Sequence, residues 1–199
     1  MLDFFGTVFS LLATYCFIKR NNLAWVLSIV AILLNSWLYF IKGIYAHMWL
    51  ESYYLITSIY GLYFWAKDKQ SKSPSISIKS LTSRDLMWLF LFISVSFLCL
   101  SSLLVYFTNS NIPYIDALTT VLSILGQFLM CKQYITAWII WLITDSLYII
   151  VYYKKQLPFH IVLMLIYTMM AIAGYLRWSK ERGFVNQKIT LEKLQAVDA

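Results

Sequence analysis

The chain has 199 residues, of which 61% are hydrophobic and only 13% are charged, and its formal net charge is +7. A soluble domain could not bury so much apolar surface, so the composition predicts an integral membrane protein whose main partner is the lipid bilayer. The positive charge does not indicate a nucleic-acid partner, because the basic residues lie at the ends of apolar runs and form no single stripe.

Apolar windows separated by polar segments predict an all-α fold with seven transmembrane helices. In chain order, we expect them at residues 4–18, 22–41, 44–66, 86–107, 116–131, 135–153 and 157–178. The longest polar break, residues 67–85, is rich in Ser and Lys and is expected to be a flexible loop. The polar tail after Trp178 is expected to form a short surface helix.

The distribution of basic residues predicts the orientation in the membrane. Seven spans place the two termini on opposite sides, and thirteen Lys and Arg residues then lie on the side of the C-terminus. Only Lys42, Lys154 and Lys155 lie on the other side. The positive-inside rule therefore places the N-terminus outside and the C-terminus in the cytoplasm, in a cell (inner) membrane.

The chain contains an internal repeat, because its two halves match without gaps at an offset of 113 residues. Among others, the offset aligns Asp3 with Asp116, Ser10 with Ser123, Lys19 with Lys132, Trp25 with Trp138, Tyr39 with Tyr152, Tyr54 with Tyr167, Gly61 with Gly174 and Trp65 with Trp178.

The repeat predicts the organisation of the chain. We expect a first three-helix repeat at 1–69, a cytoplasmic loop and linker helix at 70–113, a second three-helix repeat at 114–182 and a cytoplasmic tail at 183–199. The single linker helix makes the two repeats parallel. A parallel 3+1+3 arrangement is that of SWEET-type transporters, whose substrate sites lie near the bilayer midplane between the repeats.

Matched and unmatched positions of the repeat are expected to have different roles. Matched positions are expected to be structural: the four repeated tryptophans as interfacial belt residues, and Gly61 and Gly174 as points of close helix approach. Unmatched positions are expected to mark the site. They are Trp141 opposite Ser28, Asp145 opposite Ile32, Glu51 opposite Met164 and Asn35 opposite Tyr148.

The stretch WIIWLITD, residues 138–145, is the strongest candidate for a binding site. Trp138, Trp141 and Asp145 share one helix face, which would offer a flat organic cation an aromatic surface and an anion. Asp145 lies about ten residues into its span, where a carboxylate is costly without a cavity or a partner. No Lys or Arg lies at a similar depth, so a counter-ion for a cationic substrate is favoured over a protonated Asp bonded to another helix.

Other residues are weaker candidates for the same site. Glu51 is either an interfacial residue or a second polar contact, and Trp141 could also be a packing residue. Further pocket-lining candidates, for which helix packing or interhelical hydrogen bonding is an equal alternative, are Asn35, Trp37, Tyr60, Gln127 and Tyr148. The sequence has no phosphate-binding loop, metal-ligand cluster or nucleotide-binding domain, so we expect neither an enzyme nor a metal or cofactor.

Two sets of motifs resemble those of the PnuC-type vitamin transporters, over nearly the whole chain. The stretch YIDALTTVLSILGQFLMCKQYITAWIIWLITD, residues 114–145, is similar to that family's segment ending in W-x-x-W-x-x-x-N/D. The stretches SIYGLYFWAKDK (58–69) and IAGYLRWSKER (172–182) resemble its paired G-x-x-x-W helix ends.

The resemblance implies facilitated diffusion of an unphosphorylated vitamin, which a cytoplasmic vitamin kinase would then trap, and a homotrimer. In that family, nicotinamide riboside transporters typically carry Asn at the last motif position, and thiamine-type members (PnuT) carry Asp, as this chain does at Asp145. Trp138 and Trp141 would then sandwich the aromatic rings of thiamine, and Asp145 would pair with its thiazolium or aminopyrimidine. The alternatives are a nicotinamide riboside or riboflavin transporter of the same fold and a non-transporting membrane scaffold. A sugar transporter of the SWEET type is disfavoured, because a carboxylate stands beside the aromatic pair.

Overall fold

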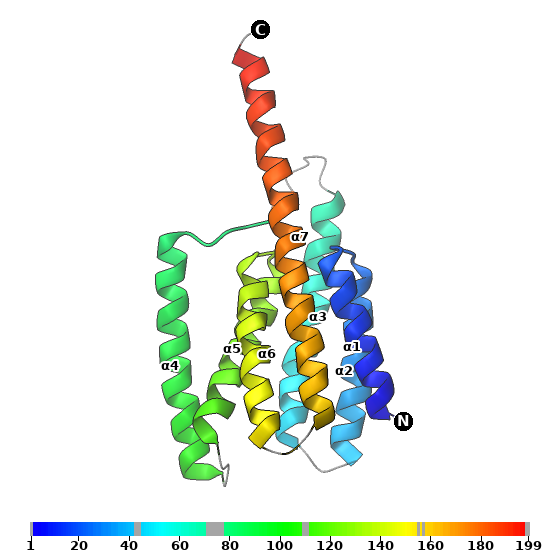
Figure 1. Ribbon diagram of the computed structural model, residues 1–199, viewed down its shortest axis with the longest axis vertical. Helices are drawn as coiled ribbons and strands as arrows, with labels where there is room; N and C mark the ends of the chain where they lie inside the picture. Colours follow the sequence, from blue (N-terminus) through cyan, green and yellow to red (C-terminus); the bar gives the residue numbers. More distant parts are fainter. Residues whose placement is uncertain are drawn as a thin grey trace.

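The computed structural model describes residues 2–41, 45–70, 78–108, 112–154, 156 and 158–197. These residues form an all-helical protein (Figure 1). The helices are α1 (Leu2–Ile18), α2 (Leu23–Ile41), α3 (Tyr45–Gln70), α4 (Ser83–Phe107), α5 (Pro113–Cys131), α6 (Thr136–Lys154) and α7 (Pro158–Val197).

Five of the described helices are long and apolar enough to cross a membrane. They are α2, α4, α5, α6 and α7 as far as Phe184. Helix α1 is apolar from Phe4 to Ile18 but shorter, and α3 is less apolar because it carries Glu51, several tyrosines and a charged last turn. The prediction of a multi-pass, all-α membrane protein is confirmed.

Two parts of the chain differ from expectation. Helix α7 continues without a break to Val197, so the tail extends the last helix and does not form a separate one (Figure 1). The expected loop 67–85 is partly fixed: α3 reaches Gln70, and Lys79 pairs with the turn before α6 by two backbone hydrogen bonds of 3.0 Å, to Gln133 and from Ile135. Residues 71–77 of that loop lie outside the described residues.

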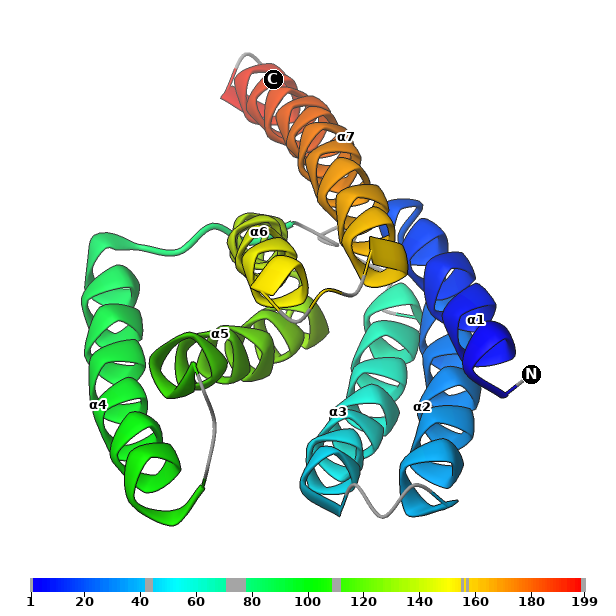
Figure 2. The same cartoon turned by 60° about the horizontal axis from the view of Figure 1, so that its bottom comes forward.

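The helices pack in two groups, with α4 to one side. Helix α2 contacts α1 and α3, α6 contacts α5 and α7, and α4 contacts α5 (Figures 1 and 2). The two groups meet through α1 with α7 and through α3 with α5. These two pairs of helices are equivalent under the 113-residue offset, so the repeat seen in the sequence is also present in the packing.

The four repeated tryptophans lie in the core and not at the membrane interface, which corrects the expectation of a belt. Trp25, Trp65, Trp138 and Trp178 are buried almost completely. Within each half, two of them meet edge to face, Trp25 with Trp65 at 5.5 Å and Trp138 with Trp178 at 5.6 Å between ring centroids. Such pairs are a favourable arrangement of aromatic rings.

Glycine makes this packing possible, as expected of Gly61 and Gly174. A methyl group on Gly61 would lie 2.5 Å from the Trp25 ring, and one on Gly174 would lie 2.5 Å from the Trp138 ring. The ring of the second helix therefore lies directly on the backbone of the third helix in both halves.

Candidate functional site

A cavity of about 720 Å³ lies among the helices of both halves. Every described helix contributes to its wall, from Ser10 of α1 to Met164 of α7. The volume is within the range of sites for small organic ligands, which are about 300–1,000 Å³. The cavity therefore lies between the two halves.

Asp145 reaches the cavity from the middle of α6. Asp145 is 7% exposed, and its carboxyl group makes no hydrogen bond or ion pair with the described residues. None of the described residues that line the cavity is basic. A buried carboxyl group whose described surroundings contain no basic residue can bind a ligand cation or a hydrogen-bond donor.

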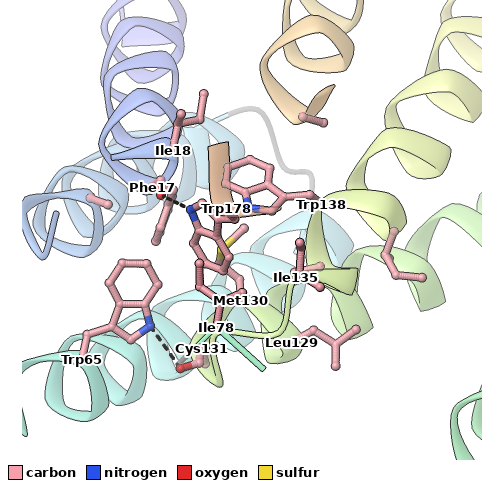
Figure 3. Close-up of a cluster of buried hydrophobic side chains, with 14 of the residues drawn as sticks. Phe17, Ile18, Trp65, Ile78, Leu129, Met130, Cys131, Ile135, Trp138 and Trp178 are labelled. Carbon is pink, nitrogen blue, oxygen red and sulfur yellow. Dashed lines mark hydrogen bonds between the residues drawn. The ribbon is translucent and has the colours of Figure 1, made fainter. Parts of the chain in front are cut away.

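Trp138 and Trp141 both touch the cavity but in different surroundings. Trp138 is 2% exposed, and its ring lies against Gly174 and Trp178, so most of its surface is used in helix packing (Figure 3). Trp141 is only half-buried and rests its indole near Gly126. It stands one helical turn from Asp145, so its ring is the one best placed to stack on a ligand beside the carboxyl.

The first half contributes two of the predicted polar residues. Glu51 is 9% exposed and lines the cavity, so it is a buried residue and not an interfacial one. Asn35 lies beside Glu51 and also lines the cavity, and its side-chain oxygen would lie 2.3 Å from a methyl group on Gly6. Any side chain at Gly6 would therefore displace the Asn35 side chain or move α1 away from α2.

The structure brings two further predicted residues to the cavity and leaves two outside. Gln127 and Tyr148 line it. Trp37 is 57% exposed and stacks on Phe40, because it follows Asn35 by two residues and so points to the other side of α2. Tyr60 likewise points away from the cavity, and the Lys132 ammonium group donates a hydrogen bond to its hydroxyl.

Sequence reasoning missed a set of lining residues that occur at matched repeat positions. They are Ser10 with Ser123, Tyr39 with Tyr152 and Tyr54 with Tyr167. They were not predicted, because matched positions were expected to be structural only. Two repeats that enclose a cavity can each line it with the equivalent face, so matched polar residues on one helix face were the available signal.

Comparisons with known proteins place the chain among vitamin transporters. A family model described as "Nicotinamide mononucleotide transporter" matches residues 1–180. The nicotinamide riboside transporter PnuC of Escherichia coli K12 is 22% identical over 173 residues, which are 73% of this chain and 72% of that protein. The protein of the same name from Neisseria mucosa is 24% identical over 179 residues, or 82% of this chain and 66% of that one.

A solved structure shows the same fold. It is the crystal structure of the vitamin B3 transporter PnuC, which matches with a TM-score of 0.73 at 21% sequence identity. The match covers 92% of this chain and 82% of that chain.

Proposed function

Because the chain belongs to the nicotinamide mononucleotide transporter family, we propose that it takes up a cationic aromatic vitamin, thiamine, by facilitated diffusion. A cytoplasmic vitamin kinase would then phosphorylate the vitamin and so trap it inside the cell. The helices would form two parallel three-helix repeats joined by α4, a 3+1+3 arrangement with seven membrane spans.

One observation supports a cationic substrate above the others: Asp145 faces a cavity whose described lining contains no basic residue. A permanently charged ring in the cavity could contact the carboxylate of Asp145 and, one helical turn away, the indole of Trp141. A cation over an indole contributes roughly 0.5–2 kcal/mol, depending on desolvation. In this proposal Asp145 is the counter-ion and Trp141 the main stacking surface, while Trp138 closes the cavity behind them.

The first half would hold the other end of the substrate. Glu51 and Asn35 line the cavity together, as do Gln127 and Tyr148 of the second half. Oxygen acceptors at this position suit the exocyclic amino group of an aminopyrimidine, which is a hydrogen-bond donor.

The main alternative is nicotinamide riboside, because the similar curated proteins are named as transporters of that compound. Its pyridinium ring is also a permanent cation, so charge alone does not separate the two vitamins. The preference for thiamine rests on the aspartate at position 145, where the resemblance associates asparagine with the riboside. Riboflavin is neutral and would not need the carboxylate.

We further propose a homotrimer with the N-terminus outside and the C-terminus in the cytoplasm. The support for the orientation is the excess of basic residues on the side of the C-terminus. The support for the trimer is the family resemblance.

Calorimetric binding of thiamine and of nicotinamide riboside to the purified protein, beside the Asp145→Asn variant, tests the substrate. We expect thiamine to bind and the substitution to weaken binding by at least roughly 30-fold, the factor for losing about 2 kcal/mol of a desolvated charge pair. Asp85→Asn is the matched control, because it also replaces a carboxylate by an amide. Asp85 belongs to the capping box of α4 and does not line the cavity.

The other outcomes separate the alternatives. Riboside binding without thiamine binding would overturn the substrate and keep the transporter. Equal thiamine affinity in the unsubstituted protein and in the Asp145→Asn variant would overturn the counter-ion role of Asp145. Binding of no vitamin at micromolar concentration would favour the non-transporting scaffold.

A further inference from the structure

A polar cluster lies at the end of the bundle where α7 projects, and the 113-residue offset relates its members in pairs. Arg20 and Gln133 occupy the same repeat position, in the turns after α1 and α5, and both have positive φ angles, 52° and 60°. Asp68 and Glu181 also occupy the same repeat position, near the ends of the apolar parts of α3 and α7. We call these four residues the polar cluster.

The following three contacts among the four residues each join one half of the protein to the other. Arg20 Nη1 lies 3.4 Å from Glu181 Oε2, and Gln133 Nε2 donates to Asp68 Oδ2 at 3.1 Å. Arg20 Nη2 donates to Gln133 Oε1 at 2.7 Å between these two contacts. The result is one continuous chain of polar contacts across the boundary between the halves.

The buried core between the cluster and the cavity is joined in the same reciprocal way. Trp65 Nε1 donates to the Cys131 carbonyl and Trp178 Nε1 to the Phe17 carbonyl, each at 3.2 Å and each across the boundary (Figure 3). Phe17 and Met130 belong to this core and also line the cavity. The core therefore lies against the wall of the cavity, on the side of the polar cluster.

We propose that the polar cluster is a gate, which holds the two halves together at the end of the bundle where α7 projects. A ligand in the cavity cannot leave past Trp65 and Trp178 unless the halves separate there. Separation breaks the cross-boundary contacts together, because they all lie on the same boundary. The cluster thus sets the balance between the closed state and a state open on that side. This inference rests on the chain being a transporter, but not on which vitamin it carries.

The chain offers a matched control for Arg20. Arg177 Nε also contacts Glu181, at 3.1 Å, but both residues belong to α7. Arg20→Gln and Arg177→Gln each remove a positively charged partner of the Glu181 carboxylate. Of the two, Arg20→Gln is the one that removes contacts across the boundary between the halves.

The test is the labelling rate of a thiol in the cavity by a membrane-impermeant maleimide, without any ligand. The reporter is Ser28→Cys, which lines the cavity, in a background with Cys16, Cys99 and Cys131 replaced by serine. The reagent is applied to each face of membrane vesicles in turn, and a separate sample with the exposed Ser179→Cys identifies the face of the α7 projection.

We expect Arg20→Gln and Asp68→Asn each to raise labelling from that face by about threefold or more, the effect of losing a partly exposed charged contact. Labelling from the opposite face should fall, and Arg177→Gln should change neither rate. Unchanged labelling in both Arg20→Gln and Asp68→Asn would overturn the gate. A rise from both faces would also overturn it, because that is the signature of a loosened fold. Neither result depends on the vitamin, so a failed gate and a failed substrate assignment remain distinguishable.

Discussion

Trp138 and Trp141 lie one turn apart on α6, and their surroundings assign them different tasks. Trp138 packs on Gly174 and Trp178, whereas Trp141 is half-buried at the cavity wall. The first-half counterpart of Trp138 is Trp25, which packs in the same way on Gly61 and does not line the cavity.

Alanine substitutions should separate binding from stability at these positions. Trp141→Ala should weaken vitamin binding by roughly tenfold, the loss of a partly desolvated cation–π contact. Trp138→Ala should instead lower the free energy of unfolding by about 3 kcal/mol or more, because it empties a packed core position. Calorimetry and thermal unfolding of the purified variants measure the two effects.

Trp25→Ala is the control for the packing role, since it should lower stability by a similar amount while the cavity wall remains intact. Equal losses of affinity in Trp138→Ala and Trp141→Ala, at unchanged unfolding temperature, would contradict this division and favour two rings around the ligand.

At the scale of the helices, the contact between a glycine and a tryptophan ring positions the third helix against the second in each half. The two contacts are nearly identical, with the same 2.5 Å distance from a would-be methyl group to the ring. In each case the nearest atoms belong to a rigid, fully buried ring, which cannot move aside as a flexible side chain would.

Gly61→Ala and Gly174→Ala should each destabilise the protein by about 1–3 kcal/mol, because the added methyl group overpacks the core. Gly183→Ala is the matched control: no atom lies within 4 Å of its would-be methyl group, and alanine has the higher helix propensity. The midpoint of thermal unfolding in detergent measures all three. Unfolding midpoints for Gly61→Ala and Gly174→Ala equal to that of Gly183→Ala would show that the helices adjust without cost.

At the scale of the whole molecule, both halves contribute to the wall of the cavity, and a buried apolar core lies against it. Transport by relative movement of two repeats would need such an arrangement. An ion-coupled mechanism usually needs a separate ionisable relay. Among the described residues, the carboxyl groups that line the cavity are those of Asp145, Glu51 and Asp116. The proposal assigns Asp145 and Glu51 to the substrate and gives no carboxyl group the role of a relay.

Transport should therefore be uncoupled from ion gradients. In proteoliposomes loaded with unlabelled thiamine, labelled thiamine should accumulate by counterflow at equal pH and equal sodium on both sides. A proton gradient imposed in either direction should leave the initial rate unchanged. Strict dependence on a proton gradient would contradict facilitated diffusion and give Asp145 a role in proton transfer.

The sequence by itself determined the membrane class, the repeat and, apart from the end of α7, the helix bounds within a few residues, because hydropathy and self-similarity are local or one-dimensional properties. It also marked Asp145, since an acid in the middle of an apolar helix stands out wherever the helix packs. Only the tertiary structure decided which side chains share the cavity. Trp37 and Tyr60 point away from it, the matched tyrosines point into it, and the four repeated tryptophans are in the core. Composition does not tell a lipid-facing aromatic residue from a buried one, because lipid and protein interior are both apolar, and helix packing alone separates them.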